Sequence, residues 1–166
     1  SQKQFFQDVD SFAFLGKMVR KANDYNLRVT SSEQVAWTNN APKIKELIEV
    51  SGISDSYVTF EYLVPYQQSR IDCMIYGSDS NDYGNVVHIE LKQWSNSSVK
   101  PDDVDSNFNV RDAESSDVDD NYKVLAFTGG SYKRTAHPSQ QVRGYDNYLT
   151  GFIEVLSTKE IGIKGM

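Results

Sequence analysis

The chain has little of several residue types that would mark a particular class of protein. Its 166 residues include a single cysteine, Cys73, which excludes an internal disulfide and favours a reducing compartment such as the cytoplasm. No apolar run approaches the roughly 18 residues that a membrane-spanning helix needs. Only two histidines are present and no Gly-x-Ser-x-Gly element occurs, which argues against a serine hydrolase. The length is that of one domain.

Basic residues are also scarce, since 17 Lys and Arg face 23 Asp and Glu for a net charge of -6. Such a balance argues against a nucleic-acid partner, because phosphate binding depends largely on Lys and Arg. Residues 102–120, however, hold eight acids and one base, a net charge of -7, so the remainder is about +1. We interpret residues 95–121 as a solvated acidic insertion. Alternatively, this segment guards a cleft electrostatically or mimics nucleic acid.

Two stretches, residues 70–76 and 86–94, alternate polar and apolar residues in the manner of half-buried strands. The intervening residues 77–85 are rich in Gly, Ser, Asp and Asn, which predicts an antiparallel hairpin with a nine-residue loop. A symmetric register sets Asp72 opposite Glu90. Two carboxylates so placed lie about 5 Å apart at Cβ and repel each other. A divalent cation would relieve that repulsion, and Mg²⁺ prefers one or two carboxylates with several waters.

The order Asp72, a gap, then Glu90-Leu91-Lys92 resembles the active-site signature of the PD-(D/E)XK nuclease superfamily, although the nominal proline is missing from Ser69-Arg70-Ile71-Asp72. Downstream, Gln141 and Tyr145 have the Gln-x-x-x-Tyr spacing of its RecB-like branch. With the preceding His-Pro-Ser, this combination is similar to nuclease-type domains that lie ahead of a P-loop ATPase in bacterial helicase-like proteins. The resemblance covers roughly residues 29–156. It implies a restriction-endonuclease-like α/β/α sandwich around a mixed four- or five-stranded sheet.

The resemblance also implies an activity, namely hydrolysis of DNA phosphodiester bonds with Mg²⁺ or Mn²⁺ as cofactor. Asp72, Glu90 and the Leu91 carbonyl would hold the metal, and Lys92 would assist the attacking water. Phosphate contacts are expected from the basic residues after the acidic segment, which are Lys133, Arg134 and Arg143, with Lys123 nearby in sequence.

Several residues near these motifs have two possible roles. His88 shares a strand face with Glu90, so it is either a ligand or phosphate contact, or a hydrogen-bonded histidine that lines the sheet. Gln141 and Tyr145 lie one helical turn apart and either position Lys92 and the metal waters or form a packed Tyr with an exposed Gln. His137 precedes Pro138, and we favour a helix cap over a phosphate contact.

A third acid often comes from the first core helix of this superfamily. Glu33 and Glu46 are the candidates, and we favour Glu33. Cys73 lies on the apolar side of its strand, where buried packing is favoured over a role as a nucleophile.

Hydrophobic spacing predicts the remaining elements. We expect a helix to about residue 23, a second from Ser31 or Ser32 that bends near residues 40–42, and a strand over residues 57–64. A further strand over residues 122–128 and a helix from Pro138 to about Leu156 follow.

The chain begins with Ser1 and stops shortly after the last expected helix, where family members usually place another strand. We therefore expect one nuclease-like domain, residues 1–166, taken from a longer protein whose remainder would carry a P-loop ATPase. The main alternative is a catalytically silent nucleic-acid-binding or interaction module on the same fold. The acidic segment and the near-neutral remainder favour that alternative, because neither predicts tight electrostatic binding.

Overall fold

The computed structural model describes residues 1–67, 69–79, 81–92, 99–101, 123–128, 131–158 and 161–166. Its centre is a sheet in the order β1-β2-β3-β7, in which β1 (Tyr57–Leu63), β2 (Arg70–Ser78) and β3 (Gly84–Ile89) are antiparallel. The last strand, β7 (Gly162–Gly165), runs parallel to β3. The predicted α/β class with a mixed sheet is therefore confirmed.

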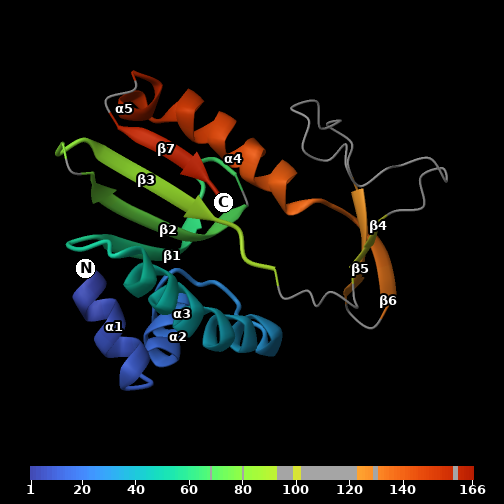
Figure 1. Ribbon diagram of the computed structural model, residues 1–166. Coiled ribbons are helices and arrows are strands. Elements are labelled where there is room, and N and C mark those ends of the chain that lie inside the picture. Colours follow the sequence, from blue (N-terminus) through green and yellow to red (C-terminus); the bar gives the residue numbers. More distant parts are fainter. Residues whose placement is uncertain (68, 80, 93–98, 102–122, 129–130, 159–160) are drawn as a thin grey trace.

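Helices lie on both faces of this sheet (Figure 1). On one face are α1 (Gln2–Asp10), α2 (Phe14–Asp24) and α3 (Ser31–Ser51), and on the other are α4 (Pro138–Phe152) and the short α5 (Glu154–Ser157). Each face has its own hydrophobic core. The first core contains Phe5, Ala41, Ile44, Ile48, Cys73, Ile75 and Ile89, and the second contains Val64, Ile71, Met74, Val86, Leu149 and Leu156.

Local sequence explains where the two long helices begin. Thr30 caps α3 in a reciprocal capping box, since its hydroxyl accepts a hydrogen bond from the Glu33 amide while the Glu33 carboxylate accepts one from the Thr30 amide. His137 caps α4 by accepting a hydrogen bond from the Ser139 amide, and Pro138 fills the first helical position. The predicted cap role of His137 is confirmed, whereas the predicted caps Ser31 and Ser32 lie inside α3.

Several predicted boundaries were wrong. The first helix is two helices, because the chain turns at Phe12, whose φ is 58° and whose side chain is exposed. α3 runs through Pro42 without ending there. The β2–β3 loop is shorter than nine residues, since both strands extend into the turn-rich segment as far as Ser78 and Gly84. A strand, β7, does follow the last helix.

Close packing of β7 depends on glycine. A Cβ atom on Gly165 would lie 2.1 Å from Cγ1 of Val142 on α4 and 2.7 Å from Cε1 of His88 on β3. No larger residue fits without moving the strand. The glycine therefore lets β7 lie between β3 and α4.

A second sheet, of order β4-β5-β6, is built from β4 (Val99–Pro101), β5 (Lys123–Thr128) and β6 (Ser131–Ala136) in antiparallel pairs. The predicted strand over residues 122–128 exists as β5, but it joins this small sheet and not the central one (Figure 1). The acidic insertion, residues 95–121, lies outside the described residues apart from β4. No described helix has the length and hydrophobicity to cross a bilayer.

Candidate active site

The predicted register of the β2–β3 hairpin is confirmed. The pairing ends at Cys73 opposite Ile89, so the predicted second strand over residues 86–94 ends at Ile89. Glu90 is the next residue after β3, and Asp72 is the residue before Cys73 in β2. The chain stays beside β2 after β3 ends, because the Leu91 amide donates to Oδ2 of Asp72 at 2.7 Å. On the other side, the Glu90 amide donates to the Met166 carbonyl at 3.0 Å. The backbone of Glu90 is thus held between β2 and the C-terminal strand.

The carboxylate of Glu90 is buried and only half satisfied. Its side chain is 5% exposed, and Oε1 accepts a hydrogen bond from the Lys92 ammonium at 2.5 Å. The second oxygen, Oε2, is buried and has no hydrogen-bond partner in the described part of the chain. Buried carboxylate oxygens are normally paired, because leaving one without a donor costs its full desolvation energy. The site therefore has an acceptor that a cation could satisfy.

Asp72 lies in the same acidic environment. Its pKa is raised to about 6, chiefly by burial and also by the negative charges of Glu90 and Glu61, while the Leu91 amide and Lys92 act in the opposite direction. A carboxylate whose pKa is raised by burial and by neighbouring acids is typical of functional sites.

Glu61 belongs to this cluster and was not predicted. Its Oε1 accepts a hydrogen bond from Nε1 of Trp37 at 2.7 Å, and its Oε2 lies 3.0 Å from Nη1 of Arg70. Burial raises the pKa of Glu61, although the hydrogen bond from Trp37 and the positive charge of Arg70 act to lower it. Glu61 and Asp72 line one small cavity of about 70 Å³, together with Trp37 and Leu91. The β1–β2 register, with Phe60 opposite Cys73 and Tyr62 opposite Ile71, brackets this pair, so a hairpin alignment of residues 57–76 could have found Glu61.

Arg70 joins two of the acids. Its Nη2 donates to Oε1 of Glu33 at 2.7 Å, while its Nη1 reaches Glu61. Burial opposes ionisation of Glu33, but hydrogen bonds from Thr30 and Arg70 hold the pKa of Glu33 below its usual value. Glu33 therefore lies at the edge of the cluster, whereas Glu46 is exposed elsewhere on α3.

Helix α4 covers the site from the other face of the sheet. The hydroxyl of Tyr145 donates to the Arg70 carbonyl at 3.0 Å, two residues before Asp72. Burial and the charges of Glu90, Asp72 and Glu61 raise the pKa of Tyr145. Gln141 lies one turn earlier on α4 and is half-buried.

His88 is fully buried between β3 and α4. Its Nε2 lies 2.5 Å from Oδ1 of Asp146, and its ring meets that of Tyr145 edge-on. Its Nδ1 is buried and has no partner among the described residues. The contact with Asp146, which sequence reasoning missed, favours the reading of a hydrogen-bonded histidine that lines the sheet.

The predicted phosphate contacts lie on other elements. Lys133 and Arg134 belong to β6 and Lys123 to β5, all in the small sheet, while Arg143 is exposed on α4. Their role stays a prediction. Cys73 is fully buried, and burial raises its thiol pKa to about 12, which agrees with packing and not with a nucleophile.

The described residues contain no group of three or more His, Cys, Asp or Glu side chains arranged as metal ligands. What they offer is a pair of carboxylates, Asp72 and Glu90, with one unsatisfied buried oxygen. Mg²⁺ and Mn²⁺ fit such a pair, because hard cations accept few carboxylates and keep several waters.

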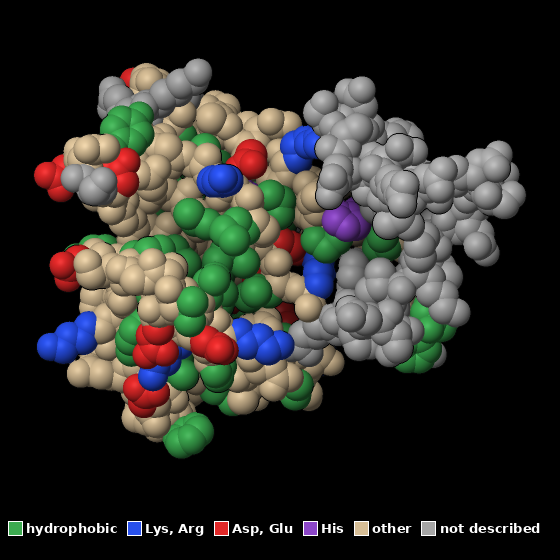
Figure 2. Space-filling view, viewed as in Figure 1, with side chains coloured by type: hydrophobic (Ala, Val, Ile, Leu, Met, Phe, Trp, Pro, Cys, Tyr) green, Lys and Arg blue, Asp and Glu red, His purple; other side chains and the backbone are tan. Residues whose placement is uncertain are grey.

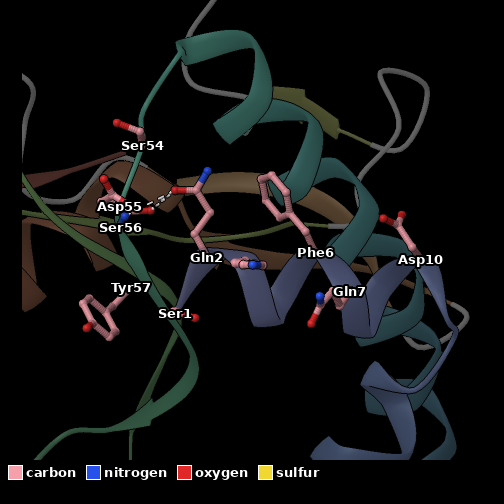
Figure 3. Close-up of a pocket in the computed structure, with 10 residues that line it drawn as sticks. Ser1, Gln2, Phe6, Gln7, Asp10, Ser54, Asp55, Ser56 and Tyr57 are labelled. Carbon is pink, nitrogen blue, oxygen red and sulfur yellow. Dashed lines mark hydrogen bonds between the residues drawn. The ribbon is translucent and has the colours of Figure 1, made fainter.

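A larger cavity lies elsewhere. About 500 Å³ in volume, it is lined by α1 and by residues 54–57 and contains none of the residues above. Figure 3 shows Gln2 reaching across it to Ser56, whose hydroxyl donates to Oε1 of Gln2 at 2.9 Å. That hydrogen bond ties the N-terminal helix to the start of β1, so we interpret this cavity as a structural junction.

Comparison with known proteins gives no relative: no protein-family model, no curated protein and no solved structure matches this chain. Fold and geometry alone define the class, which is an α/β protein with paired acids and a lysine at the end of a β-hairpin.

Proposed function

We propose that this chain is a PD-(D/E)XK-type nuclease domain that hydrolyses DNA phosphodiester bonds with Mg²⁺ or Mn²⁺. The fold supports this proposal, because a mixed four-stranded sheet with helices on both faces is the layer order of a restriction-endonuclease-like sandwich. The site supports it too, since Asp72, Glu90 and Lys92 converge at one end of the β2–β3 hairpin.

The observation that carries the proposal is the unsatisfied Oε2 of Glu90. A side chain that is 5% exposed, with one oxygen lacking a donor beside the partly buried Asp72, is electrostatically unfavourable in the absence of a cation. Proteins retain such arrangements at functional sites, where a ligand supplies the missing charge.

Each residue then has a role. Asp72 and Glu90 would hold the cation together with the Leu91 carbonyl. When bound, the cation lowers the pKa of a water molecule and offsets negative charge on the reacting phosphate. Lys92 is within hydrogen-bond distance of Glu90 and partly exposed, so its ammonium group is able to reach a water or a phosphate oxygen. Tyr145 holds the start of β2 through the Arg70 carbonyl, with Gln141 beside it on α4.

The proposal extends to partners and location. DNA would be the substrate, with Lys133, Arg134 and Arg143 as phosphate contacts, in a cytoplasmic protein that also carries a P-loop ATPase. This extension rests on the sequence resemblance.

One observation favours the alternative of a silent binding or interaction module. Basic and acidic side chains are interspersed on the face shown in Figure 2, and among its coloured residues no basic patch extends across that face. Such a surface gives little electrostatic attraction to duplex DNA.

Two measurements separate the two functions. Calorimetric titration with Mn²⁺ should show binding to the wild type and at least a tenfold weaker affinity for Glu90→Ala, with Lys43→Ala on the exposed side of α3 as a matched control. A plasmid and single-strand cleavage assay should show metal-dependent cleavage that Lys92→Ala reduces about 10²-fold or more while Mn²⁺ still binds. Metal binding without cleavage would support the silent module, and absence of metal binding would refute the metal site.

A further inference from the structure

Six charged side chains meet around the proposed metal site. They are the four acids Glu33, Glu61, Asp72 and Glu90 and the two bases Arg70 and Lys92, and we call them the charge cluster. With every group ionised, the cluster has a net charge of -2. The four acids differ in their hydrogen bonding, because some have a donor for each carboxylate oxygen and others do not.

Glu33 and Glu61 are fully satisfied. Arg70 donates to Oε1 of Glu33 and contacts Oε2 of Glu61. The other oxygen of Glu33 accepts from the amide and hydroxyl of Thr30, at 2.7 and 2.8 Å. The other oxygen of Glu61 accepts from the indole of Trp37. All four carboxylate oxygens therefore have donors supplied by the protein.

Asp72 and Glu90 differ from that pair. Oδ2 of Asp72 accepts from the Leu91 amide and Oε1 of Glu90 accepts from Lys92, but Oε2 of Glu90 is buried and has no donor within the described residues. The missing positive charge in the cluster is therefore located at Glu90 and Asp72, and not at Glu33 or Glu61.

We infer that the guanidinium of Arg70 takes the place of a second cation, so that the site binds one divalent ion, on Asp72 and Glu90. In this inference, which rests on the proposed function, Glu33 and Glu61 are positioning residues for Arg70 and not metal ligands. One divalent ion neutralises the net charge of -2, whereas a second would leave an excess of +2 in a partly buried site. Two-metal nucleases use their second ion to stabilise charge on the transferring phosphate. A permanently charged guanidinium supplies part of that charge without a metal.

The backbone at Glu61 supports this assignment. The backbone of Glu61 has a φ of 52° inside β1, a left-handed conformation that is unfavourable for a residue with a side chain. Such strain persists where the surroundings fix a residue, and Trp37 and Arg70 hold both oxygens of Glu61.

The test is the number of Mn²⁺ ions bound per chain, measured by calorimetry and by electron paramagnetic resonance on the whole protein. We expect one ion for the wild type. Glu61→Gln should also bind one ion with less than a threefold change in affinity, because glutamine keeps an acceptor for Trp37 and Glu61 is not a ligand. Arg70→Lys keeps a positive charge and should also bind one ion.

Arg70→Met should bind two ions, since it removes the partner of Glu33 and Glu61 and changes the net charge of the charge cluster to -3. Circular dichroism checks that each variant is folded. If Arg70→Met does not fold, the wild type and Glu61→Gln still decide the question. Two ions in the wild type, loss of the ion in Glu61→Gln, or one ion in folded Arg70→Met would each overturn this inference and leave the proposed nuclease site intact. No ion in any variant would overturn the proposed metal site itself.

Discussion

Asp72 shows how a single residue connects the stability of the chain to its proposed chemistry. Burial, together with the charges of Glu90 and Glu61, raises its pKa to about 6. An isolated aspartate has a pKa near 3.9. The folded state therefore retains a proton on Asp72 at pH values where the unfolded state has lost it. The contribution of Asp72 to the free energy of unfolding must therefore fall as the pH rises from about 4 to about 6, and it stays level above that range.

This argument predicts that Asp72→Asn stabilises the metal-free protein at pH 8. Asparagine keeps an acceptor for the Leu91 amide and removes the charge. The expected gain is about 1 kcal/mol, since Asp72 is partly exposed and water screens its charge. The gain should shrink as the pH is lowered from 6 to 4, which urea unfolding at several pH values would measure.

Mn²⁺ should make the wild type more stable than Asp72→Asn. At pH 8 the ion should raise the melting temperature of the wild type and leave that of Asp72→Asn unchanged. A variant that is less stable than the wild type at pH 8 without metal would contradict the raised pKa of Asp72.

At the scale of elements, the site depends on how α4 is held against the sheet. The contact between the buried His88 and Asp146 joins α4 to β3, and the hydrogen bond from Tyr145 joins α4 to the start of β2. Gly165 lets β7 pack closely against both β3 and α4. Because the Met166 carbonyl in turn accepts from the Glu90 amide, the position of β7 bears directly on Glu90.

Gly165→Ala is therefore predicted to damage both stability and metal binding. Its Cβ would lie 2.1 Å from Val142, so β7 or α4 has to move, at a cost of about 1–3 kcal/mol. Gly144→Ala is the matched control, because a Cβ there has nothing within 4 Å and lies on α4. That control should be neutral or more stable by up to about 1 kcal/mol. Equal denaturation midpoints for the two variants would show that β7 does not pack as described.

At the scale of the whole molecule, charge distribution governs any encounter with nucleic acid. The net charge is -6, and residues 102–120 contribute -7 of it, so the rest is close to neutral. An acidic segment of this size repels DNA wherever it lies within a Debye length of the binding surface.

Deleting residues 102–120 is expected to strengthen binding of a labelled oligonucleotide at low salt, by about tenfold, with the difference disappearing at high salt. Fluorescence anisotropy between 25 and 300 mM salt, on a Lys92→Ala background that prevents cleavage, would measure it. An unchanged affinity at low salt would show that the segment is a bystander insertion and does not guard the site.

The amino-acid sequence by itself determined the hairpin and its register. Alternation of polar and apolar residues predicted both strands, although β3 ends at Ile89 and not at residue 94, and the position of the turn residues gave the observed register. The cap at His137, the burial of Cys73 and the α/β class also followed from local pattern, because each depends on residues close together in the chain.

Only the tertiary structure decided which distant groups meet. Trp37 on α3 meets Glu61 and Arg70 of the β1–β2 hairpin, and no local spacing links Trp37 to that hairpin. The contact between His88 and Asp146 spans 58 positions, and β7 returns to pair with β3 from the far end of the chain. The strand over residues 123–128 has the pattern of a central strand but pairs in the second sheet. Such pairings depend on the summed burial and hydrogen bonding of the whole chain, which a short stretch of sequence does not encode.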